Sequence, residues 1–197
     1  MRSPRATRRI CHCETKEQAE ALLLELKDRF NECKLEIHPD KTKMVYCKDG
    51  NRNADYQGNT SFVFLGYEFR ARGAENKQTK VVFTGFLPAI SPKSEKSILE
   101  KIRSLHIKSR SDLSLQEIAK WMNPMIQGWL NYYSRYTKSA MNKVLKRINS
   151  TLVAWSRRKY LKLKNRKVYA IKCMKAYASK HTNLFAHWRI GVMDVFI

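Results

Sequence analysis

Apolar residues recur every three or four positions in residues 15–33, which is the period of a helix with one buried face. The repeating positions are Ala19, Leu22, Leu23, Leu26 and Phe30. Thr15 and Gln18 stand at the spacing of a capping box, in which each side chain accepts a hydrogen bond from the other residue's backbone. We therefore expect a helix that begins directly after Thr15.

The spacing then changes to the two-residue alternation that is typical of β-strands. Residues 34–47 predict two short strands joined by a turn at residues 38–40. Residues 60–72 predict a further strand, with residues 77–91 as its hairpin partner and Ala71–Asn76 as the turn between them. The first part of the chain thus predicts one helix with antiparallel strands.

Helical spacing returns after residue 91. Ser91 and Pro92 have the residue types preferred at the N-cap and the first position of a helix, so a helix is expected to start there. A short helix is expected over Ser114–Trp121. Asn123 followed by Pro124 again has the types of an N-cap and a first helical position, which predicts that a new helix starts at that point.

Two more helices are expected, over residues 139–160 and 166–180. The first of them carries a single apolar stripe, formed by Met141, Leu145, Ile148, Leu152 and Trp155. The whole pattern predicts an α+β fold, in which residues 1–91 hold the helix and antiparallel strands. Residues 92–190 then form an all-α, basic helical bundle.

Charge adds the first indication of function. The chain has 39 Lys and Arg against 17 Asp and Glu, a formal net charge of +22. Residues 118–197 contain a single acidic residue, Asp194, so the excess of cations lies in the helical part. A domain this basic is typical of proteins that bind a polyanion, although lysine-rich faces that only contact solvent are the alternative.

Several kinds of site find no support in the residues. The sequence has no Gly-rich phosphate loop, no His-Glu-x-x-His and no Cys-x-x-Cys, and its acidic residues are too scattered to predict a two-metal centre. Cys11-His12-Cys13 lacks a second ligand pair, so no metal site and no catalytic residue is predicted. The five cysteines are expected to be reduced, and no apolar run is long enough to span a membrane.

Three motifs, in order along the chain, resemble one protein family. They are LEIHPDKTKMVYC (residues 35–47), FVFLGYEFR (62–70) and WMNPMIQGWLNYYS (121–134). They are similar to the C-terminal portion of group II intron-encoded reverse transcriptases, also called intron maturases, and the resemblance covers about residues 15–190. It implies a link to RNA splicing and to a mobile genetic element.

The resemblance assigns roles to particular residues. Lys41 and Thr42 match the Lys-Thr that ends the palm segment of the polymerase. The primer-grip strand is matched by Phe64, Leu65, Gly66 and Tyr67. The maturase-specific thumb region is matched by Asn123, Pro124, Gly128, Trp129, Tyr132 and Tyr133. Residues 1–91 are therefore expected to be a partial palm and residues 92–190 the maturase-specific thumb domain.

The chain also departs from the family pattern. The family's Tyr-Ala-Asp-Asp catalytic strand would lie just before the helix at 15–33, where this chain reads RATRRICHC without an Asp (residues 5–13). We expect this polypeptide alone to lack polymerase activity and to bind no cofactor, because Mg²⁺ would belong to the ribozyme or to an intact palm. Its final residues, HWRIGVMDVFI, lack the Cys pairs of the family's endonuclease domain, so DNA cleavage is not expected.

The residues expected to bind RNA lie in the basic helices, where many cations on a rigid surface suit the phosphates of structured RNA. They are Lys120, Gln127, Asn131, Arg135, Lys138, Lys143, Lys146, Arg147, Arg157, Arg158, Lys159, Lys162, Lys164, Arg166 and Lys167. The densest cluster is SRRKYLKLKNRK (156–167). The row of Gln127, Asn131 and Arg135 on one helix face is explained equally well by RNA contact or by exposure to solvent.

The aromatic residues of the bundle divide into two expected groups. Trp121, Trp129, Tyr133 and Trp155 are expected to pack between helices, whereas Tyr132, Tyr136 and Tyr160 are expected to be partly exposed and able to stack on a base or sugar. Gly66 indicates a close approach of the backbone to a primer or to a packed neighbour.

The first hypothesis is an RNA-binding, maturase-type fragment that binds group II intron RNA and assists its splicing and folding. A primer–template duplex would be a further partner if a separate chain supplied the palm. The alternatives are an RNA-directed DNA polymerase of which this is a truncated copy, and a decayed remnant without stable function. The expected location is the cytoplasm of a bacterium, or an organelle if the source is eukaryotic.

Overall fold

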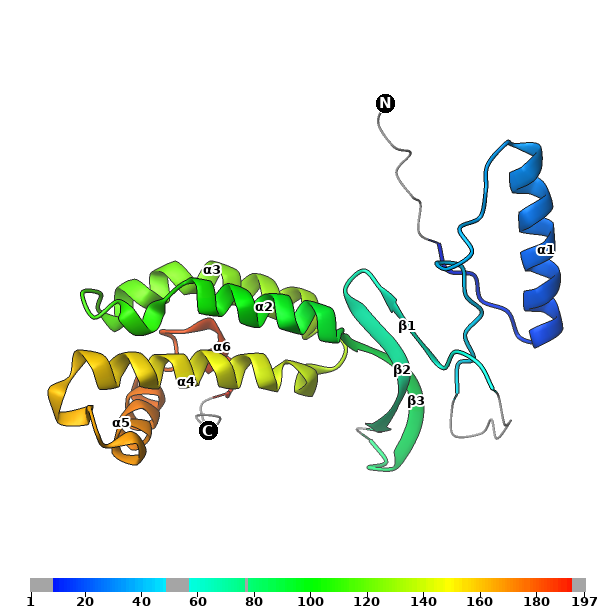
Figure 1. Cartoon of the computed structure of the whole chain (residues 1–197). Helices are drawn as coiled ribbons and strands as arrows, with labels where there is room; N and C mark the ends of the chain where they lie inside the picture. Colours follow the sequence, from blue (N-terminus) through cyan, green and yellow to red (C-terminus); the bar gives the residue numbers. More distant parts are fainter. Residues whose placement is uncertain (1–8, 49–56, 77, 193–197) are drawn as a thin grey trace. The chain divides into compact units, whose positions relative to one another are not determined.

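The computed structural model of the chain describes residues 9–48, 57–76 and 78–192 (Figure 1). The chain divides into two compact units, one formed by residues 1–46 with 55–59, the other by residues 47–54 with 60–197.

The first unit contains one helix, α1, over Lys16–Glu32. Thr15 caps it as predicted, since the Thr15 side chain accepts a hydrogen bond from Gln18 N at 3.2 Å and the Gln18 side chain accepts one from Thr15 N. None of the residues of α1 is buried, so its apolar stripe remains without a core.

The two strands predicted in residues 34–47 do not form, which corrects the sequence-based prediction. The turn is confirmed, because Lys41 N and Thr42 N both donate to His38 O, at 3.2 and 3.1 Å. A single isolated bridge joins Val45 to Asn59 among the described residues of this unit. An alternating pattern indicates which face a strand would bury, but it does not provide a neighbouring strand to pair with.

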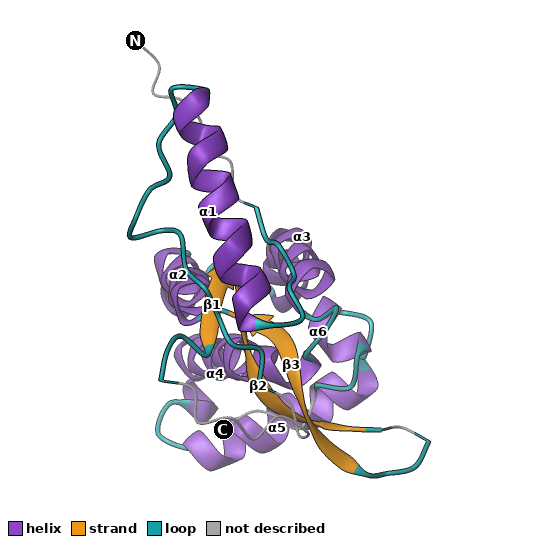
Figure 2. Cartoon of the chain, turned by 90° about the vertical axis from the view of Figure 1, so that its right-hand side faces the viewer, coloured by secondary structure: helices purple, strands orange, loops and turns teal. Residues whose placement is uncertain are grey.

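The second unit starts with a three-stranded antiparallel sheet in the order β1-β2-β3. Its strands are β1 (Ser61–Phe64), β2 (Tyr67–Glu75) and β3 (Val82–Ile90). Figure 2 shows β2 and β3 as a long, twisted two-stranded ribbon. The pairing runs from Tyr67↔Ile90 at one end to Glu75↔Val82 at the other.

Two predictions about this sheet were wrong in detail. The single strand predicted over residues 60–72 is two strands, because Leu65 and Gly66 have positive φ values of 47° and 80° and form a tight hairpin turn. The turn predicted at Ala71–Asn76 lies mostly inside β2, and the chain reverses after it, where Asn76 N donates to Val81 O at 2.9 Å.

The rest of the second unit is helical. Its α-helices are α2 (Pro92–Ser104), α3 (Leu115–Tyr133), α4 (Asn142–Lys159), α5 (Lys167–Lys180) and the short α6 (Ala186–Arg189). Short 3₁₀ helices at Ile107–Ser109, Lys138–Met141 and Leu161–Leu163 connect them. The predicted N-cap at Ser91 with Pro92 in the first turn is confirmed, and Ser91 Oγ accepts from Ser94 N at 3.2 Å.

The helix break predicted at Asn123-Pro124 is wrong, because α3 continues through it. Asn123 does not cap a helix. Its side chain instead donates to Leu184 O at 2.9 Å and accepts from Ala186 N at 3.0 Å, which holds the segment that leads into α6. Pro124 and the preceding turn at Lys120 are exposed, so water can replace the helical hydrogen bond that proline removes.

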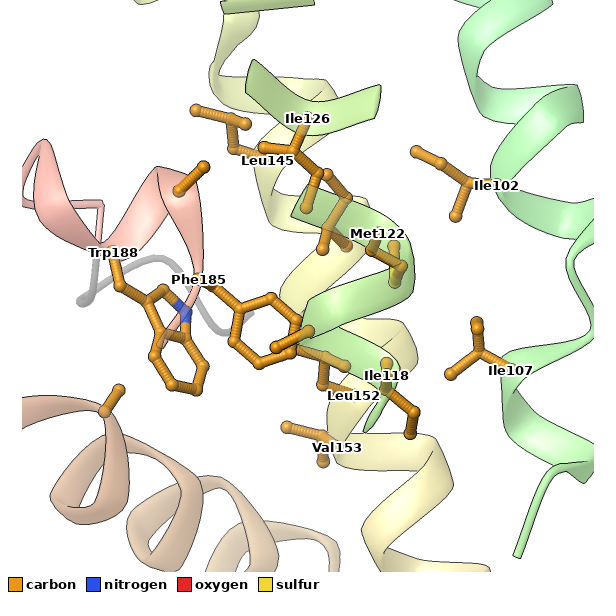
Figure 3. Packing of buried hydrophobic residues seen from close by; sticks show 14 of the residues in the cluster. Ile102, Ile107, Ile118, Met122, Ile126, Leu145, Leu152, Val153, Phe185 and Trp188 are labelled. Carbon is orange, nitrogen blue, oxygen red and sulfur yellow. The ribbon is translucent and has the colours of Figure 1, made fainter. Parts of the chain in front are cut away.

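The core of the second unit lies between α2, α3, α4 and the segment around α6 (Figure 3). The predicted stripe of α4 is confirmed, since all five of its residues are buried. Its main partners in the core are Ile102, Ile107, Ile118, Met122, Ile126, Phe185 and Trp188.

The structure confirms the α+β class, with a small antiparallel sheet followed by a helical region. The domain boundary at residues 91 and 92 stays a prediction. In the part of the chain that the structure describes, no helix combines the length and the hydrophobicity that crossing a membrane requires.

Candidate nucleic-acid interface

Helix α4 carries cations along the side that faces away from the core. Its 3.6-residue period places Lys143, Lys146, Arg147, Arg157 and Arg158 on one side and the buried stripe on the other. We call these five residues the α4 basic face. Lys143, Lys146 and Arg158 are exposed, and Arg147 and Arg157 are half-buried.

An open groove of about 310 Å³ runs along the first half of this face, between α2 and α4. It is lined by Leu99, Arg103, Lys143, Lys146, Arg147 and Ser150. Four of these six residues are cations, and Arg103 comes from α2, so two helices contribute charge to one groove. Such a groove offers guanidinium and ammonium donors to an anion such as a phosphate.

The acidic groups near the groove do not neutralise it. Lys143 Nζ lies 2.5 Å from Glu95 Oε1 of α2, which ties α4 to α2 at the end of the groove. Among residues 118–192, all of which the structure describes, no other Lys or Arg takes part in an ion pair. The same segment contains no Asp or Glu, so its cations other than Lys143 have no carboxylate partner within the described residues.

The basic cluster of residues 156–167 continues from the end of α4 through a 3₁₀ helix into α5. Arg157 is fixed there, because its Nε and Nη2 both donate to Lys164 O, at 3.2 and 3.0 Å. Lys162, Lys164, Arg166 and Lys167 are exposed, and their side chains make no hydrogen bond or ion pair within the described residues.

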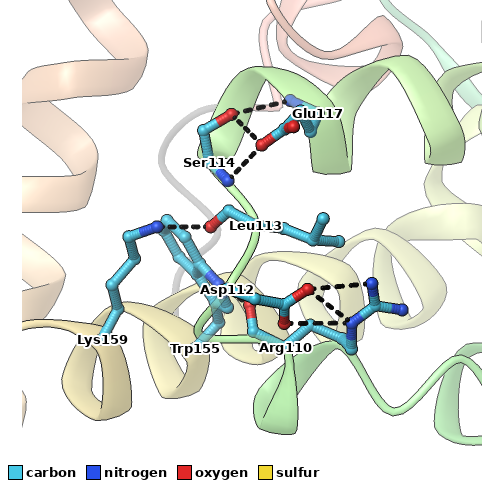
Figure 4. A network of polar contacts seen from close by, with 7 residues as sticks. All are labelled: Arg110, Asp112, Leu113, Ser114, Glu117, Trp155 and Lys159. Atoms are coloured by element: carbon cyan, nitrogen blue, oxygen red, sulfur yellow. Dashed lines mark hydrogen bonds and ion pairs between the residues drawn. The ribbon is translucent and has the colours of Figure 1, made fainter.

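Two residues of the cluster have structural contacts that the sequence does not reveal, and Figure 4 shows those of Lys159. Lys159 lies on the core side of α4, where its Nζ donates to Leu113 O at 2.6 Å and lies 5.5 Å from the Trp155 ring centre. Trp155 Nε1 donates to Arg110 O at 2.8 Å, so both side chains fasten the loop between α2 and α3 to α4. Arg158 Nη1 donates to Ser109 Oγ in the same loop.

That loop leads into α3 through a capping box. Ser114 Oγ accepts from Glu117 N at 3.2 Å and the Glu117 carboxylate accepts from Ser114 N at 2.7 Å. The hydrogen bonds from Ser114 lower the pKa of the Glu117 carboxyl. Beside it, the Arg110 guanidinium lowers the pKa of Asp112, which lies 3.0 Å away.

The remaining predicted RNA-binding residues are distributed around α3 and its end. Lys120, Gln127 and Asn131 are exposed on α3, and Gln127 Nε2 donates to Asn131 Oδ1 at 2.7 Å. Arg135 does not share their helix face as predicted, because α3 ends at Tyr133. Lys138 is exposed at the start of the following 3₁₀ helix.

The primer-grip-like residues form the turn between β1 and β2. Phe64 pairs with Tyr67, and Leu65 and Gly66 make the reversal. Gly66 O accepts from Ser91 N at 2.9 Å and from Ser94 Oγ at 3.1 Å, at the first turn of α2. The turn is therefore anchored directly to the start of the helical region.

Helix α3 holds the same turn from its last residues. Tyr132 Oη donates to Leu65 O at 2.7 Å, and Tyr67 Oη donates to Tyr132 O. The rings of Tyr132, Tyr133 and Tyr136 all lie within 5.6 Å of the Tyr67 ring. Burial and these neighbouring phenols raise the pKa of Tyr67.

The close approach at Gly66 is to packed neighbours. A Cβ at this position would lie 3.0 Å from Ser94 Oγ and 3.1 Å from Tyr133 Oη. The palm-like residues Lys41 and Thr42 belong to the first unit, where they are exposed at the turn described above.

The predicted burial and exposure of the aromatic side chains are confirmed except at Trp121, and stacking on a base or sugar stays a prediction. Trp155 is buried, Trp129 and Tyr133 pack partly against the core, and Tyr132, Tyr136 and Tyr160 are exposed. Trp121 is 42% exposed, because it lies on the side of α3 opposite Met122 and Ile126. A spacing of three or four residues does not identify the face when aromatic side chains occur on several sides of one helix.

Three residues of the basic surface were missed by reasoning from the sequence. Arg103 reaches the groove from α2, a contact that follows only from the packing of α2 on α4. Leu161 and Tyr169 line a second open pocket of about 470 Å³ with Lys162, Lys164, Asn165 and Arg166. For Leu161 and Tyr169 the sequence did contain a signal, which is an apolar or aromatic residue within or next to a run of cations.

Two comparisons with known proteins bring no match, since no curated protein and no solved structure is significantly similar to the chain. Residues 95–174 match the family model described as the group II intron, maturase-specific domain. The matched segment extends from the first turn of α2 to the middle of α5, and so contains the groove and the basic cluster. This similarity fits the C-terminal maturase portion of a group II intron protein and supports a maturase-related role in group II intron splicing.

Proposed function

We propose that the chain binds group II intron RNA through the α4 basic face and the adjoining groove, and that it stabilises the folded intron for splicing. The observation that carries the proposal is the coincidence of the maturase-specific segment with a surface rich in cations, in a stretch of the chain, residues 118–192, that contains no Asp or Glu. The ribozyme would carry out the transesterification with its own Mg²⁺.

The geometry of α4 suits the phosphates of a structured RNA. Lys143 and Arg157 are separated by fourteen residues, which corresponds to about 21 Å along a helix. A rigid row of cations over that length can contact several phosphates at once without ordering a flexible segment. Arg103 and Arg147 in the groove supply forked guanidinium donors, which bind phosphate in a fixed orientation.

The contacts made within the protein refine the set of proposed RNA ligands. Lys159 is engaged with Leu113 O and Trp155, so we assign it to holding the loop before α3. Lys146, Arg147, Lys162, Lys164 and Arg166 line the two pockets and make no ion pair within the described residues, and we assign them to RNA. Lys143 lines the groove as well and is assigned to RNA with them, although its Nζ also pairs with Glu95. Lys120, Gln127, Asn131, Arg135, Lys138, Arg157, Arg158 and Lys167 would extend the same surface.

We further propose that this role requires no polymerase site in the chain itself. Residues 5–13 contain no acidic residue to hold a catalytic metal ion. The proposed function requires only that the chain binds RNA, and such binding depends on the charge and shape of the protein surface. Extension of a primer by the isolated chain with Mg²⁺ would overturn this part of the proposal.

A second candidate function is that of a reverse-transcriptase thumb acting with a palm from a separate chain. It is favoured by the turn at Leu65–Gly66, which matches the family's primer-grip motif and is fixed to both α2 and α3. Addition of a separately produced palm should then restore primer extension. If no primer extension is detected, the thumb function is contradicted and the maturase role is the one that remains.

The proposed function is tested by competition between the intron RNA and an unrelated structured RNA of the same length at moderate salt. A maturase should retain its intron at least tenfold better, whereas a merely basic protein should bind both equally. The variant Lys146→Glu with Arg147→Glu should lose about tenfold or more in intron affinity, because two phosphate contacts become repulsive.

A matched control reverses two exposed cations of the first unit, Lys27→Glu with Lys43→Glu, and so changes the net charge by the same amount. The intron affinity of this control should differ from that of the wild type by less than about twofold. That small difference is the general effect of net charge. Equal losses in the two double variants would contradict a binding site on α4.

A further inference from the structure

The pocket between α4 and α5 differs in kind from the rest of the basic surface. It is lined by Leu161, Lys162, Lys164, Asn165, Arg166 and Tyr169 and has a volume of about 470 Å³. We propose that this pocket binds one unpaired RNA nucleotide, with Tyr169 against the base and the surrounding cations against its phosphates. The proposal rests on the proposed function only in taking RNA as the ligand.

The segment that forms the pocket is ordered by its own contacts. Leu163 is buried in the core at the centre of the segment. Successive turns are closed by hydrogen bonds from Leu163 N to Tyr160 O at 2.9 Å, from Lys164 N to Leu161 O at 3.1 Å and from Arg166 N to Leu163 O at 3.1 Å. Together with the two hydrogen bonds from Arg157 to Lys164 O, they make the pocket a preformed feature.

Large apolar side chains are held in solvent on this ordered segment. Leu161 is 84% exposed and Tyr169 is 53% exposed, and both line the pocket. Exposing their apolar surface to water on a segment that Leu163 anchors is unfavourable. An apolar surface next to cations fits a ligand that has one flat apolar part and one anionic part.

The charges around the pocket indicate what the anionic part is. Lys162, Lys164 and Arg166 line it, and no acidic residue lies in the segment. No side chain caps the first turn of α5, where Arg166 is the N-cap, so backbone N–H groups there add to the positive potential. These groups match phosphates on both sides of one nucleotide.

An unpaired nucleotide suits the pocket better than a duplex does. Bases inside an A-form helix stack on one another and present no free face, whereas bases in loops and bulges can stack on an exposed aromatic ring. The volume of the pocket falls in the range of about 300 to 1,000 Å³ that is typical of small-ligand sites, which is enough for a single base with its sugar.

The test uses short labelled RNAs in place of the intron and the full chain in all cases. One probe is a single-stranded oligouridylate of about eight nucleotides, and the other is a blunt RNA duplex with a similar number of phosphates. Tyr169→Ala should weaken binding of the single strand by about fivefold to a hundredfold, since stacking on an aromatic ring contributes that much for one base. Duplex binding should change less than about twofold.

Two control variants separate stacking from other effects. Tyr169→Phe keeps the ring and should bind the single strand like the wild type. Val168→Ala removes an adjacent apolar side chain that is 69% exposed but does not line the pocket, and it should have no effect. Lys162→Gln with Lys164→Gln should reduce the salt dependence of single-strand binding, which tests the pocket without changing Tyr169.

The inference is overturned if Tyr169→Ala leaves single-strand binding unchanged, or if it weakens the single strand and the duplex equally. It is also overturned if Tyr169 supports binding to vesicles of anionic phospholipid but not to the oligouridylate. Because neither RNA probe is the intron, a failure here leaves the competition test of the proposed function standing. A failure of intron preference likewise leaves the result for the pocket unaffected.

Discussion

His187 is completely buried beside α4, where a charged ring would have no access to water. Its Nε2 lies 2.7 Å from Asn149 Oδ1, which also accepts from Trp188 Nε1 at 3.1 Å. Asn149 Nδ2 donates to Val192 O, so the oxygen faces the histidine and Nε2 carries the proton. Nδ1 has no hydrogen-bond partner in the described structure, and burial lowers the pKa of His187 to about 3.

This histidine makes the stability depend on pH in a definite window. The unfolded chain binds a proton at His187 below its ordinary pKa of about 6.5, whereas the folded chain stays neutral down to about 3. The free energy of unfolding should therefore fall as pH decreases from 6.5, by up to about 1.4 kcal/mol per pH unit. Chemical denaturation at pH 7.5, 6 and 5 measures this slope.

Two substitutions show whether the slope comes from His187. His187→Gln should flatten the dependence between pH 6.5 and 5, whatever its effect at pH 7.5. His12→Gln changes an exposed histidine and should leave the slope as in the wild type. Glu17, Asp112 and Glu117 have lowered pKa values, so their contributions are lost only at lower pH.

Lys159 has a structural role that follows from its contacts inside the protein, whereas the neighbouring cations are assigned to RNA. Lys159→Met keeps the apolar stem but leaves Leu113 O without its donor. The free energy of unfolding should fall by about 1 to 2 kcal/mol, as for other half-buried carbonyl groups that lose a partner. Lys162→Met changes an exposed lysine nearby and should stay within about 0.5 kcal/mol of the wild type in urea denaturation.

At the level of elements, the connection between the sheet and the helices depends on the hairpin turn of β1 and β2. The turn contacts the first residues of α2 through Gly66 O and the last residues of α3 through Leu65 O. The three tyrosine rings around Tyr67 add apolar contacts on the same side. Because two helices hold one turn, a change there should affect the stability of the whole unit.

Gly66→Ala tests this connection. Gly66 has a φ of 80°, and its added methyl group would lie within 3.1 Å of Ser94 Oγ and Tyr133 Oη. The free energy of unfolding should decrease by about 1 to 3 kcal/mol, from backbone strain together with the displacement of two packed side chains.

Gly128→Ala is the matched substitution, since Gly128 lies within α3 and a Cβ there would meet nothing within 4 Å. It should stabilise the protein by about 0.5 to 1 kcal/mol, because alanine favours the helix. Equal effects of the two glycine substitutions in thermal or urea denaturation would contradict the packing at the turn.

The features of the fold that could be predicted from the sequence are those specified by neighbouring residues. The caps at Thr15 and Ser91 and the buried stripe of α4 depend on spacing along a single helix, and all three were predicted correctly. The continuation of α3 through Pro124 could not be predicted, because Asn123 uses its side chain to bond residues 61 and 63 positions away instead of capping a helix.

The basic surface shows the same limit at the scale of the whole molecule. The excess of cations after residue 117 was evident from composition. The groove itself depends on α2 lying beside α4, and the separation of Lys159 from the other cations depends on which face of α4 packs inward. Neither contact follows from the order of residues alone, since each requires the packing of helices that are distant in sequence.

The proposed binding of intron RNA phosphates to the α4 basic face can be tested directly at the scale of the whole molecule. The most direct measurement is the logarithm of intron affinity against the logarithm of salt concentration, for the wild type and for Lys146→Gln with Arg147→Gln. Loss of two phosphate contacts should reduce the steepness of the line by about 1.4 to 1.8, while Lys27→Gln with Lys43→Gln should leave it unchanged. Lines of the same slope for all three proteins would contradict the account.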